Sequence, residues 1–155
     1  MLKNWRVSIL GIAIVASLTA LIAQYIFNVS PCKFCIYQRY PYYALILLSA
    51  IFLLLKINQN KLFYILIELV LIGGIIVTIW HLGIENNLIK GPEGCSNSFD
   101  NILSVESLKS KILEGPVVAC DQVNWTFLGI SMVFYNLLLQ LLLFTLNSIL
   151  LFKKV

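Results

Sequence analysis

Residues 30–39, which read SPCKFCIYQR, lie between two long apolar stretches of the chain. Cys32 and Cys35 have the Cys-x-x-Cys spacing of redox-active dithiols, and Arg39 follows Cys35 by about one helical turn. If the flanking stretches cross a membrane, a reactive dithiol and a fixed positive charge stand where the chain enters the bilayer. The fold therefore depends on whether these stretches are long enough to span it.

The composition indicates an integral membrane protein. Of the 155 residues, 60% are hydrophobic and only 12% are charged, which is too little charge for a soluble domain of this size. The formal net charge of +4 does not imply a nucleic-acid partner. The charged residues flank apolar blocks, so membrane topology explains them.

Four apolar stretches are long enough to be transmembrane helices, at about residues 7–27, 36–55, 62–82 and 127–152. The second would be only about 22 Å long if it began at Pro41, so we expect its helix to begin near Ile36. The sequence thus predicts an all-α membrane protein, a four-transmembrane-helix bundle that forms a single integral-membrane domain over residues 1–155. A long outer loop, residues 83–125, joins the last two spans, and within it residues 101–113 have the apolar spacing of a short interfacial helix.

The distribution of basic residues predicts the orientation in the membrane. Four spans place both termini and the connection 56–61 on one side, and the positive-inside rule puts that side in the cytoplasm. All four cysteines then fall on the outer face, where disulfides persist. We interpret the first span as a retained anchor, because its apolar run is longer than that of a signal peptide. The basic residues on the terminal side, which carries no acidic residue, are Lys3, Arg6, Lys56, Lys61, Lys153 and Lys154.

The Cys-x-x-Cys motif is expected to hold a reactive thiolate. Cys32 would lie near the N-terminus of the second helix, where the helix dipole favours a thiolate. Arg39 would lie one turn below Cys35, and a charge about 4 Å away lowers a pKa by at most about 3 units at an effective dielectric of about 20. A structural disulfide is the simpler alternative. No metal site is expected, because Cys95 and Cys120 do not form a second Cys-x-x-Cys.

The chain resembles the DsbB family of membrane disulfide-forming proteins, including its BdbC-type members. The resemblance is carried by PCKFCIYQR, by the second cysteine pair in PEGCS and ACDQ, and by WTFLGISM, which starts at Trp125. It implies a thiol:quinone oxidoreductase of the bacterial cytoplasmic membrane. Such a protein reoxidises a soluble, extracytoplasmic thioredoxin-fold oxidant (DsbA-like) and passes the electrons to ubiquinone or menaquinone.

The resemblance also implies roles for individual residues. Cys32 and Cys35 match the quinone-proximal pair, and Cys35 contacts the quinone itself. Arg39 matches the quinone-contacting arginine, and His81 matches a histidine near the quinone. The partner-facing pair is matched by Cys95 and Cys120.

Two other functions remain open at this point. The chain could be a structural or assembly subunit whose outer disulfides only brace the loop, or a conduit that carries electrons outward. The conduit would need a cysteine on the inner face, and none of the four is expected there.

Glu68, inside the third span, is a candidate functional acid, with a hydrogen-bonded structural role as the simpler interpretation. Asn136 and Gln140 are expected to link helices.

Overall fold

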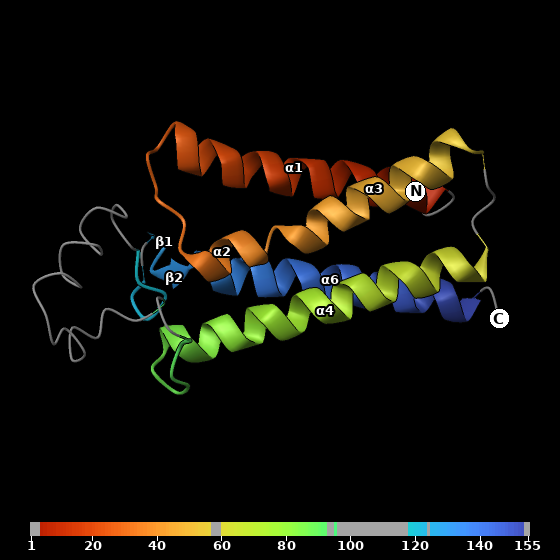
Figure 1. Cartoon of the computed structure of the whole chain (residues 1–155). Coiled ribbons are helices and arrows are strands. Elements are labelled where there is room, and N and C mark those ends of the chain that lie inside the picture. Colours follow the sequence, from red (N-terminus) through yellow and green to blue (C-terminus); the bar gives the residue numbers. More distant parts are fainter. Residues whose placement is uncertain (1–3, 57–59, 93–94, 96–117, 124, 154–155) are drawn as a thin grey trace, which may run out of the picture.

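The structure of the protein, a computed structural model, describes residues 4–56, 60–92, 95, 118–123 and 125–153. It is mostly helical (Figure 1). Among the described residues, three helices are long and apolar enough to cross a membrane: α1 (Trp5–Tyr25), α4 (Lys61–Glu85) and α6 (Met132–Lys153). They support the helical membrane fold that the composition predicts. The interfacial helix predicted over residues 101–113 lies outside the described residues.

The second predicted span is not one continuous helix. It consists of a short helix, α2 (Lys33–Tyr37), and a longer one, α3 (Tyr40–Leu54), with a turn between them. Pro41 accounts for the break, because it has no N–H to donate to the carbonyl of Tyr37 and its ring crowds that carbonyl. The uninterrupted helix expected from Ile36 is therefore wrong. With 15 residues, α3 alone is about 22 Å long and shorter than a bilayer core, so four complete spans stay a prediction.

The last long helix begins later than predicted. We expected it from residue 127, whereas α6 begins at Met132 and a short antiparallel hairpin precedes it. The hairpin pairs β1 (Thr126–Phe127) with β2 (Ile130–Ser131), and the two residues between them, Leu128 and Gly129, have φ of 51° and 79°. Two successive positive φ values form the tight turn that suits twisted antiparallel strands. Gly129 is the sequence signal for this turn, but the apolar residues around it favour a helix instead.

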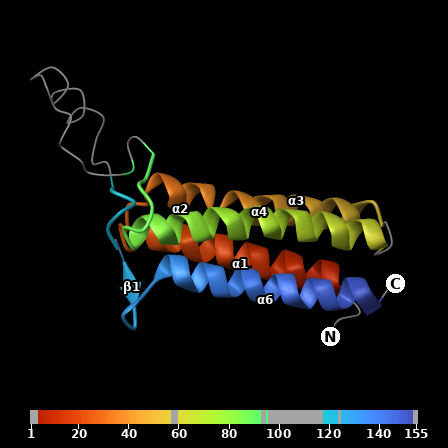
Figure 2. The same cartoon turned by 90° about the horizontal axis from the view of Figure 1, so that it is seen from below.

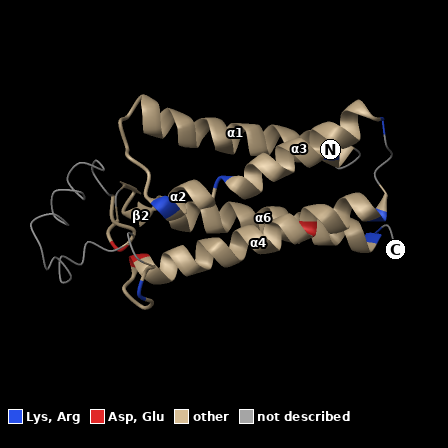
Figure 3. Cartoon of the chain, viewed as in Figure 1, with Lys and Arg blue, Asp and Glu red and all other residues tan. Residues whose placement is uncertain are grey.

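The long helices pack as two pairs. α1 packs against α3 and α4 against α6, and α3 also contacts α4 (Figures 1 and 2). The start of α1 and the end of α6 lie at one end of the bundle, which we call the terminal end, together with the end of α3 and the start of α4 (Figure 1). α2 and the hairpin lie at the opposite end, which we call the α2 end. Lysines lie where helices end or begin at the terminal end (Figure 3). The core includes Trp5, Ile9, Leu45, Phe63, Ile67, Leu71 and Leu143.

Polar side chains link the helices inside this apolar bundle. Asn136 on α6 accepts a hydrogen bond from the Tyr42 hydroxyl on α3 and donates one to Thr78 on α4. Gln140, one turn further along α6, accepts a hydrogen bond from Thr78. These contacts confirm the predicted role of Asn136 and Gln140 in joining helices.

Glu68 belongs to a second polar group nearer the terminal end. Its carboxylate oxygens accept hydrogen bonds from Asn147 and Ser148 on α6. Asn147 also donates to the Tyr64 carbonyl over 2.9 Å and accepts from the Trp5 indole over 3.0 Å. These contacts join α1, α4 and α6, so they support the structural interpretation of Glu68.

Candidate redox site

The first cysteine pair lies at the start of α2. Cys32 is the N-cap residue, and its Sγ accepts a hydrogen bond from the backbone N–H of Cys35 over 3.2 Å. The two sulfur atoms are 2.8 Å apart, with the Cys32 thiol donating to Cys35. Cys32 is buried, whereas Cys35 is partly exposed and lines the cavity described below. The local fold therefore presents Cys35, rather than Cys32, to that cavity.

The second cysteine pair lies directly against the first. Cys95 and Cys120 are both buried, and the backbone N–H of Cys120 donates to the Cys95 carbonyl over 2.6 Å. Cys95 and Cys120 pack with Cys32 in one buried cluster. Phe34 and Ile84 complete this apolar cluster. The resemblance implies two cysteine pairs on one side of the membrane, and the structure packs the second pair against the first.

His81 reaches the thiol cluster from α4. It is buried, and its Nε2 lies 3.4 Å from Cys32 Sγ while its Nδ1 lies 3.0 Å from Nε2 of Gln38. Contacts at both ring nitrogens fix the orientation of the imidazole. Gln38 is not among the predicted site residues. Its polar side chain lies beside Arg39 at the expected membrane boundary, and that position could have identified it as a site residue.

Hydrogen bonding makes the two thiols of the first pair unequal. The hydrogen bond from Cys32 lowers the pKa of Cys35, and the same bond, together with burial, raises the pKa of Cys32 to about 12. The Arg39 guanidinium also lowers the pKa of Cys35, but by less than the Cys32 thiol does. The thiolate expected at Cys32 is therefore wrong, because Cys35 is the member that ionises more easily. Burial raises the pKa of Cys95 to about 12 and also raises the pKa of Cys120.

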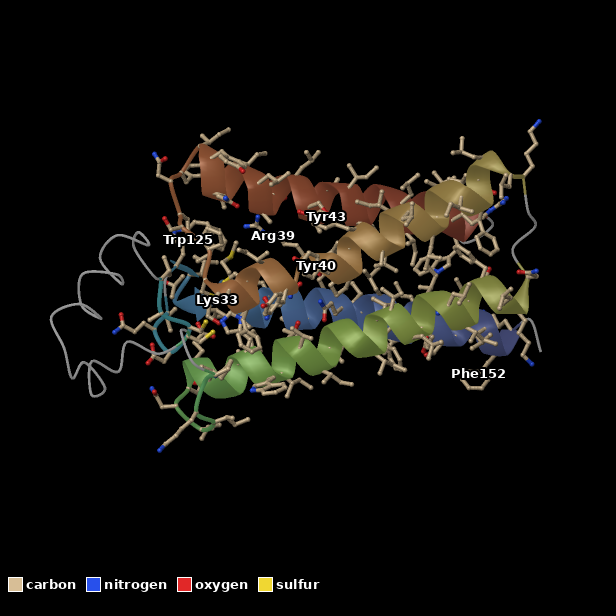
Figure 4. All side chains as sticks on the ribbon, in the orientation of Figure 1. Lys33, Arg39, Tyr40, Tyr43, Trp125 and Phe152 are labelled. Carbon is tan, nitrogen blue, oxygen red and sulfur yellow. The ribbon has the colours of Figure 1, made fainter. Side chains whose placement is uncertain are left out.

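Arg39 lies at the break between α2 and α3 and extends toward α1 (Figure 4). Its Nη1 donates to Oε1 of Gln24 on α1 over 2.6 Å. This contact holds the guanidinium between the two helices and leaves further N–H groups of its planar fork available as donors. Gln24 is a second site residue absent from the sequence predictions. An amide in an otherwise apolar span is the signal that could have identified it.

An apolar cavity of about 940 Å³ extends from Cys35 along α1 and α6. Cys35, Arg39 and His81 line its α2 end, and Trp125, close to the hairpin, lies at the same end (Figure 4). Further toward the terminal end the wall consists of α1 and α6 side chains, including Ile12, Ala16, Leu139 and Leu146. The cavity is thus polar at one end and apolar along its length.

The arrangement has the parts needed for two kinds of chemistry. Thiol–disulfide exchange requires an attacking thiolate, an adjacent sulfur and a good leaving thiol, and the contacts from Cys95 through Cys120 and Cys32 to Cys35 provide them in a row. The cavity has the volume of a small-molecule site, roughly 300–1,000 Å³. A cationic donor at one end and long apolar walls fit a polar ring with an apolar tail. The residues present therefore fit a quinone.

The fold and the site together define a helical membrane protein with two interacting cysteine pairs. Residues 3–150 match the family described as DsbB, disulfide bond formation protein DsbB, and the chain belongs to this family. It is 34% identical over 152 residues to the uncharacterized protein RP370 of Rickettsia prowazekii, covering 97% of this chain and 88% of that protein. It is 29% identical over 120 residues to disulfide bond formation protein B of Methylobacillus flagellatus, covering 72% of this chain and 70% of that protein. Family membership supports a membrane function in disulfide-bond formation.

Proposed function

We propose that this protein is a thiol:quinone oxidoreductase, which reoxidises a soluble thioredoxin-fold dithiol protein and passes two electrons to a membrane quinone. The observation that carries the proposal is the row of thiols formed by the buried cluster of Cys95, Cys120 and Cys32 and by Cys35, whose Sγ lies 2.8 Å from that of Cys32. This row ends at the apolar cavity, beside Arg39. Membership of the DsbB family supports the disulfide-forming half of the reaction.

Electrons enter at the second cysteine pair. A thiolate of the reduced partner attacks Cys95 in the Cys95–Cys120 disulfide, which forms a mixed disulfide and releases Cys120 as a thiolate. The second thiol of the partner then displaces Cys95, so the partner leaves with its own disulfide. Two electrons and two protons have moved from the partner to Cys95 and Cys120.

The contact between Cys120 and Cys32 supports the next transfer. Cys120 attacks Cys32 in the Cys32–Cys35 disulfide and releases Cys35, whose thiolate is stabilised by a hydrogen bond once Cys32 is again a thiol. Cys95 then displaces Cys32 from Cys120, which restores the Cys95–Cys120 disulfide. The first pair now holds the two electrons and two protons.

The quinone, when bound, supplies the two-electron acceptor. Arg39, held by Gln24, would donate N–H hydrogen bonds to it at the α2 end of the cavity, and Cys35 presents its sulfur to the same space. His81 lies next to both, contacts Cys32 and lines the cavity. The apolar walls of α1 and α6 would accommodate an isoprenoid tail.

The same proposal includes a membrane topology. α1, α2 with α3, α4 and α6 would each cross the bacterial cytoplasmic membrane, within one domain over residues 1–155. Both termini would be cytoplasmic, which the basic residues near the terminal end support. The α2 end would then face outward, where a soluble oxidant reaches Cys95, and lipid would cover the exposed apolar faces of the long helices.

The test is whether the purified protein oxidises a reduced thioredoxin-fold dithiol when a short-chain ubiquinone or menaquinone is present. We expect one quinol for each disulfide formed and no turnover in Cys35→Ser. Thr145→Ala, on the exposed face of α6, is the matched control and should retain activity. A structural or assembly subunit would show no quinone-dependent oxidation, and Cys35→Ser would then change nothing.

A further inference from the structure

Three potential metal ligands meet at the first cysteine pair. The Sγ atoms of Cys32 and Cys35 and a ring nitrogen of His81 all lie within 4.8 Å of one another. We propose that the reduced Cys32–Cys35 pair, together with His81, forms a binding site for a zinc-class divalent cation. Two thiolates and an imidazole are a ligand set that zinc prefers.

The distances approach those of a tetrahedral zinc site. With Zn–S of about 2.3 Å and Zn–N of about 2.0–2.1 Å, a tetrahedral angle places two sulfurs about 3.8 Å apart and a sulfur and a nitrogen about 3.6 Å apart. Cys32 Sγ and His81 Nε2 are already 3.4 Å apart. The two sulfurs, now 2.8 Å apart, have to separate by about 1 Å. Cys35 has room to move because it lines the cavity, and the fourth position is left to water.

Gln38 allows His81 to offer the required lone pair. A metal at Nε2 requires the ring proton to be on Nδ1, where it needs an acceptor. Gln38 lies 3.0 Å from Nδ1, and its amide provides an acceptor oxygen when it is rotated by a half-turn. The same side chain therefore serves either tautomer, and it acts as the outer partner that orients the histidine. Spacing of the cysteines alone could not predict this site, because His81 is far from them in the sequence.

The site exists in only one redox state. Binding the cation displaces one proton from each thiol, whereas a Cys32–Cys35 disulfide removes both sulfur ligands. The regulatory consequence rests on the proposed function. A bound cation would hold the reduced pair as a metal thiolate, and its electrons would not pass to the quinone until the metal leaves. A zinc-class cation would thus arrest the enzyme in its reduced state.

The experiment is a cobalt titration of the full-length protein in detergent, reduced and freed of reductant under anaerobic conditions. We expect thiolate-to-cobalt charge-transfer absorption and the visible bands of four-coordinate cobalt, both lost when Zn²⁺ is added. Oxidised wild type should give neither. His81→Ala should weaken cobalt binding by at least about 10-fold. Loss of a residue that only orients a metal ligand already weakens metal binding by about 10-fold or more, and His81 is itself a ligand. Trp80→Phe, a neighbouring change that leaves all three ligands, is the control.

Several outcomes would overturn the site. Absence of the four-coordinate spectrum from reduced wild type rules it out. A spectrum that persists in Cys35→Ser assigns the metal to Cys95 and Cys120, and unchanged affinity in His81→Ala removes the histidine. If a variant does not fold, a measurement on reduced wild type still tests the site. Zn²⁺ should slow alkylation of Cys35, followed by mass spectrometry, and an unchanged rate would rule the site out.

The cobalt spectrum needs neither quinone nor partner, so it can fail or succeed separately from the proposed function. The regulatory role has its own readout. Zn²⁺ should slow quinone reduction over the same concentrations at which it displaces cobalt, and a chelator should restore the rate. Zinc that binds without slowing turnover would contradict that role.

Discussion

Gly74 determines how closely α3 can approach α4. A Cβ added at Gly74 would lie 3.0 and 3.1 Å from two ring carbons of Pro41, and 3.2 Å from Nε2 of Gln140. Nonbonded carbon atoms usually keep about 3.5–4.0 Å. The proline ring is fixed to its backbone, so α3 itself has to move to relieve the contact. A Cβ added at adjacent Gly73 would meet no other described residue within 4 Å, apart from its chain neighbours and its own helix backbone, so Gly73 supplies a matched control.

The two alanine variants should therefore differ in stability. Alanine in place of a mid-helix glycine stabilises a protein by roughly 0.5–1 kcal/mol, and this gain is expected for Gly73→Ala. Overpacking a filled interface costs about 1–3 kcal/mol. Gly74→Ala experiences both effects, so we expect its free energy of unfolding to be about 1–3 kcal/mol below that of Gly73→Ala.

The assay is unfolding of both variants in mixed micelles by titration with sodium dodecyl sulfate, followed by circular dichroism. A second readout is quinone reduction. Pro41 is close to Arg39 in the chain, so Gly74→Ala should slow turnover while Gly73→Ala leaves it unchanged. Unfolding free energies of the two variants that agree within about 0.5 kcal/mol would refute the close contact between α3 and α4.

Three further predictions follow from the proposed function. Cys120→Ser, mixed with the oxidised partner, should accumulate a mixed disulfide on non-reducing gels, because the Cys95 thiolate attacks the partner's disulfide and no Cys120 thiol remains to displace the partner. An adduct formed through Cys32 instead would reverse the order of the two pairs. Arg39→Met should raise the apparent KM for quinone at least about 10-fold, since a hydrogen bond from a charged group contributes roughly 1.5–3 kcal/mol, whereas Arg39→Lys keeps the charge and should lose less. Wild-type quinone kinetics in Arg39→Met would leave Arg39 as a membrane anchor. A membrane-impermeant thiol reagent should label the cysteines in intact, reduced cells, and labelling only after lysis would contradict the proposed orientation.

Much of the fold could be predicted from local sequence properties. The long apolar runs predict α1, α4 and α6 to within a few residues, because helix length and hydropathy depend only on neighbouring residues. The errors occur where the same local criteria conflict. Pro41 interrupts a run that is otherwise apolar enough to continue, and Leu128 with Gly129 turns the chain before α6 begins.

The candidate site also combines residues that local sequence predicts with residues that it does not. Cys32, Cys35 and Arg39 form a local motif, and their proximity follows from spacing along the chain. The second cysteine pair and His81 were assigned to the site through the family resemblance, whereas spacing along the chain placed them only on the same side of the membrane. Gln24 and Gln38 hold Arg39 and His81 in the structure. Their polar side chains at or in an apolar span were a signal, but the sequence does not say which residues they contact.

The class of protein and the approximate positions of the long helices could be predicted from the sequence alone, because hydropathy, charge and spacing are properties of short segments. The tertiary structure decided which atoms meet. Packing of α2 against α4 brings Cys32 to His81, and Cys120 packs into the same buried cluster as Cys32. It also decided which thiol ionises more easily, because a pKa depends on the hydrogen-bond donor that the fold places beside the sulfur. Contacts between residues so far apart along the chain arise from packing of whole helices, which no short segment encodes.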